Sequence, residues 1–470
     1  MMSQKETLLS VITRSLEDVD PGSVVRKSVS YDPDREVLTI QGTELSIGRN
    51  QDIYVLGSGK ASAAMGQALE QVLGDRIRDG IIITPKDTAG KGSRGRGTRE
   101  EGRTASPEII QLLEGSHPLP DRHSLASTYE LIDLARHIPE GSFVFYMLSG
   151  GSSALLCMPA GDLEIGDIAE THSMLLKSGA NIHEMNVVRT VVSAVKGGQL
   201  LKHLSKVVLA DLIISDVPGD AFRSIGSGPT TPGNAEYGKA SGILRKYGLW
   251  DRIPSAVRDH ISTGISDGGS AGVHGHPGEH HQFLVSSARK LADSVAERCR
   301  RQGYQVDIIT PAYDAAIAEV EASIIKKVQQ AIVDRMDKAS GLNAGGPGRC
   351  FIYYGESTVQ VSGPGKGGRN QELALRIARH LTPGDSVTFA SVGTDGVDGP
   401  TDAAGAVVDG HTMEQAKKLG LDPEDYLRNN DSYHFFEQTG DLIKTGPTGN
   451  NLMDLQVVLI GEQGNREPEQ

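Results

Sequence analysis

The chain has few of the residues that mark a secreted, disulfide-stabilised protein. Its 470 residues include three cysteines and one tryptophan, and aromatic residues make up 4% of the total. Cys157, Cys299 and Cys350 show no Cys-x-x-Cys spacing, so the sequence supports neither a disulfide framework nor a structural zinc site. We expect all three to be buried thiols.

Long hydrophobic runs are also missing. No apolar stretch approaches the ~18 residues that a membrane-spanning helix needs. Residues 1–20 mix charges into a helical pattern and lack the apolar region and cleavage site of a secretory signal. We therefore expect a cytoplasmic protein with no membrane partner.

Positive charge is in the minority. The formal net charge of −13 opposes general binding to a nucleic-acid backbone. The basic segment 91–103 contains no aromatic residue for base stacking, which favours a solvated loop. The expected partners are therefore small molecules, and an anionic substrate must be held by local cations. A monomer and a homodimer both remain open.

Glycine, by contrast, is abundant, with 57 residues. Many glycines follow short apolar runs, such as 53–56, 143–148 and 209–215, which alternate with helical patterns. This alternation predicts an α/β fold with parallel strands. Segments 106–114 and 124–137 are expected to be helices.

The length of the chain predicts at least two domains, because a single core rarely serves so many residues. Residues 225–280 are rich in Gly, Pro, Ser and His, which is typical of a crossing between domains. We place the boundary near 240, which gives domains 1–240 and 241–470.

Two glycine-rich turns predict a phosphate site. Glycines let backbone amides approach an anion without a Cβ in the way, and a following helix adds its positive end. Lys60 stands at a helix start, where a cation opposes the macrodipole and so favours a nearby anion. Lys60 is therefore a catalytic candidate. The ATP-binding candidates in these turns are Gly57, Ser58, Gly59, Ser149, Gly150, Gly151, Ser152 and Ser153.

Aspartates follow several of the predicted strands. Asp216 and Asp220 flank Val-Pro-Gly, and Asp395 lies in a Thr-Asp-Gly turn. Carboxylates at such turns can hold Mg²⁺ or accept a proton from a hydroxyl group, but they also commonly cap turns. Both interpretations remain open. We take Asp216 as a catalytic candidate and the other two as metal candidates.

Two helical segments supply further candidates. Arg369 opens a helix in Gly-Gly-Arg-Asn-Gln-Glu and can offer a bidentate fork to carboxylate or phosphate, although it can equally be an exposed first-turn residue. A second pattern, around residues 186–196, by itself predicts a partly buried helix face. The candidate substrate contacts are Asn370, Glu372, Asn186 and Arg189.

Together these segments resemble the class II glycerate kinase family, whose carboxyl-terminal part is called the MOFRL domain. The matching motifs follow one another over most of the chain: 56–61, 114–120, 148–155, 177–180, 196–198, 215–220, 227–230, 367–373, 393–405 and 429–450. The chain departs from the family pattern at Thr190-Val191, where Lys-His is expected, and in the segment 86–103.

The resemblance implies ATP-dependent phosphorylation of D-glycerate, generally at the 2-hydroxyl group, with Mg²⁺ or another divalent cation. It implies an α/β fold of two domains, an N-terminal Rossmann-like domain and a C-terminal MOFRL-type domain, with a cleft between them. It carries over Lys60 and Arg369 as the leading functional pair.

Two other functions remain as alternatives. A hydroxypyruvate reductase would need a dinucleotide motif, but the turn that starts at Gly57 lacks the third glycine of Gly-x-Gly-x-x-Gly. A non-catalytic sensor of sugar acids or nucleotides would have less use for the lysine, arginine and aspartates together.

Overall fold

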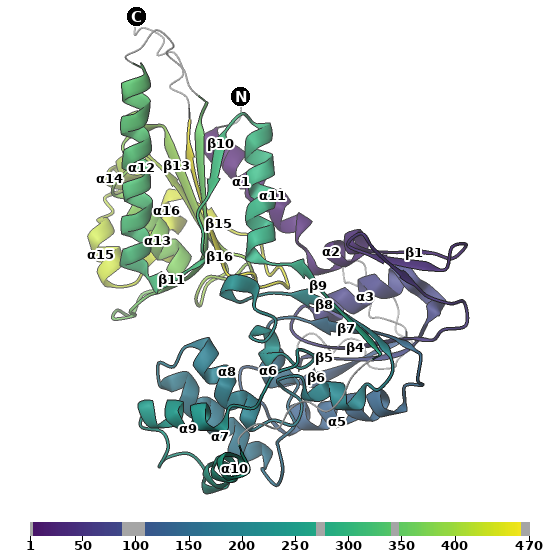
Figure 1. Cartoon of the computed structure of the whole chain (residues 1–470). Helices are drawn as coiled ribbons and strands as arrows, with labels where there is room; N and C mark the ends of the chain where they lie inside the picture. The colour runs from purple at the N-terminus through teal and green to yellow at the C-terminus, as the bar shows by residue number, and fades with distance from the viewer. Residues whose placement is uncertain (1–2, 87–108, 269–277, 340–346, 462–470) are drawn as a thin grey trace, which may run out of the picture. The chain divides into compact units, whose positions relative to one another are not determined.

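The computed structural model describes residues 3–86, 109–268, 278–339 and 347–461. The chain forms two compact units. Pro21–Ser286 make up one, which we call the parallel-sheet unit, and Met1–Asp20 with Ser287–Gln470 make up the other, the mixed-sheet unit (Figure 1). The atypical segment 86–103 lies outside the described residues except for Lys86, and so does the basic segment 91–103 within it.

The boundary between the units differs from the predicted one. Residue 240 lies inside α9 (Tyr237–Lys246), and the parallel-sheet unit continues to Ser286. The reason is that β9 (Glu279–Ser286) supplies the last strand of the parallel sheet by pairing with β8 (Val208–Ile214). The first helix, α1 (Gln4–Asp18), is as predicted but belongs to the mixed-sheet unit.

The parallel-sheet unit is built on a six-stranded sheet in the order β6-β5-β4-β7-β8-β9. All neighbouring strands are parallel. This is the order of a doubly wound sheet. From β4 the chain first adds strands on one side of the sheet and then, starting with β7, on the other side. Such sheets bind ligands at the point between these two strands, where the strand order reverses. The remaining strands of the sheet are β4 (Ile53–Ser58), β5 (Ile77–Pro85), β6 (Ile110–Gly115) and β7 (Phe143–Leu148).

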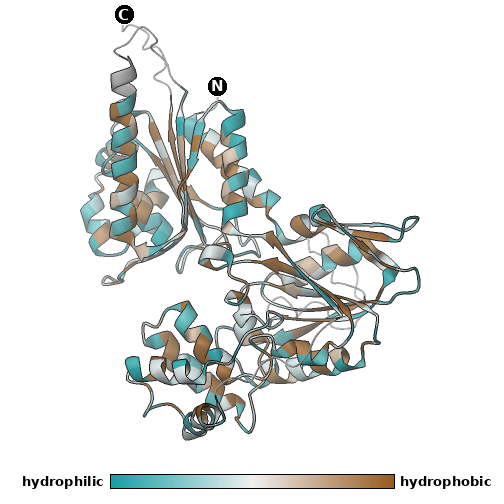
Figure 2. Ribbon diagram, viewed as in Figure 1, coloured by the Kyte–Doolittle hydropathy of each residue, from teal (hydrophilic) through white to brown (hydrophobic). Residues whose placement is uncertain are grey.

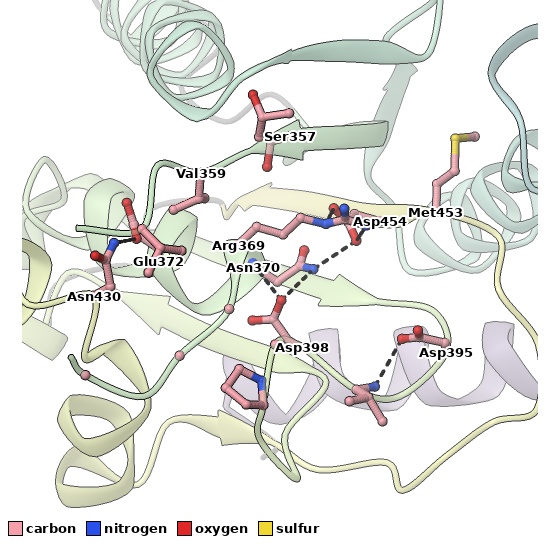
Figure 3. A pocket seen from close by; sticks show the side chains of 18 of the residues that line it. Ser357, Val359, Arg369, Asn370, Glu372, Asp395, Asp398, Asn430, Met453 and Asp454 are labelled. Atoms are coloured by element: carbon pink, nitrogen blue, oxygen red, sulfur yellow. Dashed lines mark hydrogen bonds and ion pairs between the residues drawn. The ribbon is translucent and has the colours of Figure 1, made fainter. Parts of the chain in front are cut away.

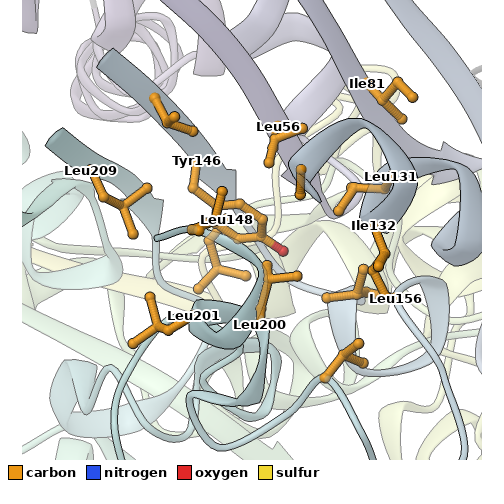
Figure 4. Close-up of a cluster of buried hydrophobic side chains, with 14 of the residues drawn as sticks. Leu56, Ile81, Leu131, Ile132, Tyr146, Leu148, Leu156, Leu200, Leu201 and Leu209 are labelled. Carbon is orange, nitrogen blue, oxygen red and sulfur yellow. The ribbon is translucent and has the colours of Figure 1, made fainter. Parts of the chain in front are cut away.

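Helices cover both faces of this sheet. Leu131 and Ile132 of α5 (Arg122–His137) pack with Leu56 and Tyr146 in a buried cluster on one face (Figure 4). On the other face, α3 (Ser62–Leu73) places Gly66 against Ile82. The other elements of this unit are α2 (Pro21–Ser28), β1 (Val29–Asp32), β2 (Val37–Ile40), β3 (Thr43–Ser46), α6 (Ser152–Leu155), α7 (Ile165–Lys177), α8 (Ile182–Val191) and α10 (Ser255–Ser266), with the short 3₁₀ helices η1 (Gly74–Arg76), η2 (Gln199–His203), η3 (Pro218–Asp220) and η4 (Ile225–Ser227).

Helices α7 to α10 form a group with its own hydrophobic core. Leu175 of α7, Val188 of α8, Leu244 of α9 and Val257 of α10 are all buried in one cluster. This packing fixes α8, and with it the side chains that α8 contributes to the site described below.

The helix predicted over 106–114 is wrong, because Ile110–Gly115 is strand β6. A short apolar run fits either a strand or a buried helix turn, and here pairing with β5 decides the matter. Residues 106–108 lie outside the described part of the chain. The helix predicted over 124–137 is confirmed by α5.

The mixed-sheet unit has a sheet in the order β10-β12-β16-β13-β14-β15, with β11 also paired to β12. Only the pairs that β12 makes with β10 and β11 are parallel. The prediction of parallel strands is therefore wrong for most of this sheet, from which the glycine-rich turns at 365–370 and 394–399 extend. Its strands are β10 (Gln305–Ile308), β11 (Tyr313–Ala316), β12 (Arg349–Thr358), β13 (Val387–Gly393), β14 (Gly405–Asp409), β15 (Leu442–Ile443) and β16 (Asp454–Ile460).

Within this unit, α1 and α11 (Ala288–Arg301) lie on one face of the sheet, and α12 (Ile317–Ala339) and α13 (Arg369–Ala378) lie on the other (Figure 1). The strands of both sheets are largely hydrophobic, whereas the helices have one polar face (Figure 2). The remaining elements are α14 (Thr412–Leu419), α15 (Pro423–Arg428), α16 (Ser432–Thr439) and η5 (Pro383–Asp385).

The cysteine prediction is confirmed: Cys157, Cys299 and Cys350 are free and buried. Within the described ranges, no helix combines the length and the hydropathy that a membrane crossing requires.

Candidate functional site

The two glycine-rich turns of the parallel-sheet unit lie side by side at the point where the strand order reverses. The amide of Lys60, after β4, donates to the carbonyl of Gly150, after β7, at 2.9 Å. The amide of Ala61 donates to the Oγ of Ser149 at 3.0 Å. A side chain from one turn therefore caps the start of α3, which has no side-chain cap of its own.

Two glycines are required for this close approach. Gly59 has φ of +141°, and a Cβ on it would overlap Ser149. A Cβ on Gly150 would overlap the carboxylate of Asp216, which follows β8. The turns after three neighbouring strands thus meet, and Asp216 lies directly over the second glycine-rich turn.

Three of the predicted ATP-binding serines are internal. Ser58 and Ser152 are fully buried, and their hydroxyl groups hydrogen-bond each other at 2.5 Å, with Tyr146 at 2.8 Å from Ser58. Ser149 is also buried and hydrogen-bonds Ser62 at 3.1 Å. These hydroxyl groups hold the turns together, so the geometry does not support their direct contact with a phosphate.

The helix that follows the second turn is also shorter than expected. α6 contains four residues, Ser152–Leu155. A macrodipole needs several aligned turns of helix, so α6 adds little positive potential at this place. The attraction for an anion must come mainly from side chains, of which Lys60 is exposed.

A cavity of about 160 Å³ opens beside these turns, and we call it the Arg189 cavity. It brings together Asp216, Ser153 and Gly151 from the loops with Arg189 from α8. Lys60 lies against Gly151 at its edge. The complete lining is His117, Pro118, Gly151, Ser153, Ala154, His172, Leu176, Ile182, Arg189, Asp216, Val217, Ser224 and Gly226.

Asn186 supports Arg189 inside this site. Both side chains are more than nine-tenths buried, and the Nη1 of Arg189 donates to the Oδ1 of Asn186 at 3.4 Å. The same Oδ1 accepts from Ser227 at 3.0 Å, and the Asn186 Nδ2 donates to the Ser224 carbonyl at 3.0 Å. Asn186 therefore positions Arg189, and it is not among the residues that line the cavity.

Two histidines of the cavity were not among the predicted site residues. Burial, followed by Lys60 and Arg189, lowers the pKa of His117 to about 4. Burial and the nearby Arg189 and Lys196 hold the pKa of His172 well below its ordinary value. Both imidazoles are therefore neutral at pH 7, mainly because they are buried, and the nearby cations act in the same direction.

A second cavity, of about 500 Å³, lies in the mixed-sheet unit, and we call it the Arg369 cavity (Figure 3). It forms at the edge where β12 and β13 end and the antiparallel β16 begins, since Gly355 and Gly393 both pair with Asp454. The predicted residues Arg369, Asn370, Glu372 and Asp395 line it, together with Asp398 and Asp454.

The guanidinium of Arg369 is already paired. Its Nε lies 2.6 Å from Asp454 and its Nη2 lies 3.1 Å from Glu356. Burial raises the pKa of Asp454 to about 7, and Arg369 acts in the opposite direction. The two carboxylates in turn hold Arg369 in its charged form. The bidentate fork predicted for a ligand is thus occupied within the protein.

The start of α13 is occupied as well. Asp398 accepts from the amide of Asn370 at 3.1 Å and from the amide of Gln371 at 2.8 Å. The Asn370 side chain donates to Asp454 at 2.9 Å (Figure 3). A carboxylate therefore fills the place that a phosphate would take at this helix end.

The other predicted residues of this cavity also have protein partners. Glu372 is buried, and its carboxylate pairs with Arg376 at 3.0 Å and accepts from Asn430 at 3.0 Å. Asp395 accepts from the amide of Val397 at 3.1 Å, which is the turn-capping geometry left open by the sequence.

The two predicted metal ligands belong to different units. Asp220 lies on η3 of the parallel-sheet unit and does not line the Arg189 cavity, and Asp395 belongs to the mixed-sheet unit. No group of three or more His, Cys, Asp or Glu suited to a metal occurs in the part of the chain that the structure describes. Asp216 is the acid that lies with the glycine-rich turns.

Two family models match the chain. One, described as a domain of unknown function (DUF4147), covers residues 7–262, and the MOFRL family model covers residues 349–454. The first match includes every residue of the Arg189 cavity, and the second ends at Asp454.

Curated relatives match over nearly the full length. A glycerate 2-kinase from Pyrococcus horikoshii is 32% identical and aligned over 99% of both chains. A D-glycerate 2-kinase from Thermotoga maritima is 33% identical over 97% of this chain and 99% of its own. A human glycerate kinase is 31% identical over 98% of this chain and 94% of its own.

Solved structures agree with these matches. A crystal structure of a Pyrococcus horikoshii protein gives a TM-score of 0.79 at 32% identity, covering 98% of this chain and all of that one. A glycerate kinase from Thermotoga maritima gives a TM-score of 0.78 at 32% identity over 97% and 99% of the two chains. The order of motifs, the fold and the full-length similarity lead to one conclusion: this chain belongs to the glycerate kinase family with DUF4147 and MOFRL domains.

Proposed function

We propose that the protein transfers the γ-phosphoryl group of ATP to the 2-hydroxyl group of D-glycerate. The observation that carries this proposal is the Arg189 cavity at the reversal point of the parallel sheet. There, Lys60 and Asp216 from the sheet-edge turns lie with Arg189. Relatives named as glycerate 2-kinases, aligned over nearly the full length, support the choice of substrate.

The parallel-sheet unit serves in this proposal as a Rossmann-like nucleotide-binding domain. Gly57, Gly59, Gly150 and Gly151 leave the backbone of the turns without side chains, and Lys60 supplies a charge for the phosphates. Ser153 lines the cavity, where its hydroxyl group hydrogen-bonds Ser227 at 2.8 Å, and it stays the candidate among the predicted ATP-binding serines.

Asp216 fits a role with Mg²⁺. Proteins usually bind this ion through one or two carboxylates, with the substrate phosphates completing its coordination. A single carboxylate beside a phosphate-binding turn meets that requirement. The ion would screen the charge of the phosphates, and Asp216 would hold it or orient the attacking hydroxyl group.

In this proposal, catalysis depends mainly on how the protein positions ATP and glycerate. The transferring phosphoryl group passes through a loose transition state, so alignment and charge stabilisation matter more than a strong base. Lys60 stabilises the developing charge, and Arg189 and Asn186 fix the acceptor.

Several assignments remain predictions. Arg369 would offset charge on the phosphoryl group or clamp the carboxylate of glycerate, with Asn370 and Glu372 as neighbours in the Arg369 cavity. Asp220 and Asp395 remain candidate metal ligands. The location in the cytoplasm and the state as a monomer or homodimer also belong to this proposal.

The decisive experiment incubates the protein with ATP, Mg²⁺ and D-glycerate and identifies the product with enolase, which accepts only the 2-phosphate. We expect ADP and a product that enolase consumes. A parallel assay follows NADH with hydroxypyruvate and should show no oxidation. ADP release without an enolase substrate would contradict the 2-hydroxyl assignment, and no glycerate-dependent ADP would contradict the kinase proposal.

A further inference from the structure

Two residues that line the Arg189 cavity each have a deeply buried side-chain nitrogen with no hydrogen-bond partner in the described part of the chain. Arg189 is 8% exposed and His172 is 2% exposed. The Nε of Arg189 and the Nε2 of His172 make no hydrogen bond with any residue that the structure describes. Buried polar groups are nearly always hydrogen-bonded, so two such nitrogens in side chains that line one cavity indicate a missing ligand.

The position of Arg189 is fixed by the protein before any ligand arrives. Asn186 accepts a hydrogen bond from the Nη1 of Arg189. Asn186 is itself held by hydrogen bonds with the hydroxyl group of Ser227 and the carbonyl of Ser224. A guanidinium held on one edge leaves the rest of its rigid fork for another acceptor. The site is thus built for a planar group that accepts two hydrogen bonds.

The charge around the cavity favours an anion. Burial lowers the pKa of Arg189 without bringing it into the physiological range, because a guanidinium stays protonated in proteins. Lys196 is also buried close enough to influence His172, and Lys60 lies at the edge. Asp216 is the only carboxylate among the described residues of the lining.

The size of the cavity distinguishes between two anions that the protein would bind, a small acid and a nucleotide triphosphate. Its volume is about 160 Å³. Pockets for drug-sized ligands begin at about 300 Å³, so this one suits a small acid and not a nucleotide with its triphosphate. Gly151 and Ser153 line the cavity, whereas Gly59, Gly150 and Lys60 do not and remain for the phosphates.

We propose that the Arg189 cavity binds the carboxylate of a small 2-hydroxy acid, with Arg189 as the charged clamp and His172 as a neutral donor. The identification of that acid as D-glycerate rests on the proposed function. Arg189 and His172 are then the residues that make the enzyme specific for an acid, and the cavity walls set the size of that acid.

The test compares D-glycerate with its neutral amide, glyceramide, as acceptors for wild-type protein and for Arg189→Gln. Loss of a charged hydrogen bond reduces binding by about 10- to 100-fold. We expect the wild type to prefer the acid strongly, and R189Q to raise KM for D-glycerate by that factor and to lose most of the preference. KM for ATP should stay within about threefold.

Three controls accompany this test. Arg252→Gln removes an exposed arginine of the same unit and should change neither constant. His172→Gln should raise KM for D-glycerate by about three- to tenfold, as expected for a neutral hydrogen bond. Arg189→Lys keeps the charge without the fork, so it should lie between wild type and R189Q, and it serves as the test variant if R189Q does not fold by circular dichroism.

Two results would overturn the inference. One is an unchanged preference for the acid in R189Q; the other is a raised KM for ATP with normal KM for D-glycerate, which would make the cavity a phosphate site. If wild-type protein does not phosphorylate D-glycerate, the proposed function fails on its own. Calorimetry with D-glycerate, glycolate and D-lactate then decides the inference: Arg189-dependent binding supports it, and binding equal in both proteins, or absent from both, refutes it.

Discussion

The two cavities of this protein differ in how their arginines are used. Arg189 lines a small cavity in the parallel-sheet unit, and its Nε has no partner among the residues placed in the structure. Arg369, in the mixed-sheet unit, is paired with Asp454 and Glu356 in a larger one. The first site is prepared for an anion, whereas in the second the Nε and Nη2 of the arginine are already used by carboxylates of the protein.

This contrast follows from the two sheets. In the parallel sheet, every strand delivers its carboxyl end to one edge, and the three turns that meet there contribute Lys60 and Asp216. In the mixed sheet, antiparallel pairing brings the start of β16 to the ends of β12 and β13. Asp454 therefore lies beside Arg369, and the charges neutralise each other within the protein.

The largest expected effect tests the site in the parallel-sheet unit, beside the glycine-rich turns. Lys60→Ala removes the cation beside the glycine-rich turns, and we expect kcat to fall by about 10³-fold or more, because charge stabilisation dominates phosphoryl transfer. The assay follows ADP release with D-glycerate. Lys206→Ala, which removes an exposed lysine paired with Glu140, is the matched control and should keep normal turnover. Normal turnover in K60A would exclude Lys60 from the mechanism.

The next effect tests the Arg369 cavity, in which the arginine is paired with carboxylates of the protein. At pH 8, above the pKa of about 7 that Asp454 has beside Arg369, Arg369→Gln leaves a buried carboxylate without its cation, which should lower the free energy of unfolding by about 3–5 kcal/mol. Trp250, the only tryptophan, belongs to the parallel-sheet unit, so its fluorescence follows that unit while circular dichroism follows both. We expect the circular dichroism signal of R369Q to be lost at a lower denaturant concentration than that of wild type, whereas the unfolding transition followed by tryptophan fluorescence should change less.

A double variant separates stability from catalysis at Arg369. Removing both partners in R369Q/D454N should recover most of the lost stability, because no buried charge is left unpaired. If Arg369 acts on the phosphoryl group or the carboxylate, the recovered protein stays poorly active. A stable and fully active double variant would limit Arg369 to a structural role.

The last effect, the smallest for each pH unit, is the pH dependence of the same pair. The pKa of Asp454 is raised from 3.8 to about 7 by burial. Between these values the folded chain holds a proton that the unfolded chain has released, so this group makes folding less favourable as pH rises. The loss is at most ~1.4 kcal/mol per pH unit. Denaturant unfolding of wild type and Asp454→Asn from pH 4 to pH 8 measures it, and D454N should lack this component. Parallel curves for the two proteins would show that Asp454 titrates normally.

Local sequence was sufficient for the turns of the parallel-sheet unit. The apolar runs at 53–56 and 143–148 and the glycines after them predicted two strands that lead into glycine-rich turns, and the structure brings these turns within hydrogen-bonding distance of each other. The strand after which Asp216 stands was also predicted, and it is β8. These features depend on neighbours in the chain, which a sequence displays directly.

Features that depend on distant partners were missed or misplaced. His172 belongs to a helix with an ordinary amphipathic pattern, and only its packing beside Arg189 makes it part of the site. Asp454 begins a plain apolar strand, and nothing in its own segment signals the pairing with Arg369. The candidate serines illustrate the reverse case, since Ser58 and Ser152 turned inward toward Tyr146.

The sequence by itself determined the α/β character, the glycine-rich turns and the residue types that phosphoryl transfer needs. These follow from backbone geometry and from the spacing of apolar residues along the chain. The tertiary structure alone decided where each unit ends, which arginine is neutralised and which donors remain without partners. Those outcomes depend on strand pairing and burial between segments far apart in the chain, where the free energy of a charge is set by its surroundings.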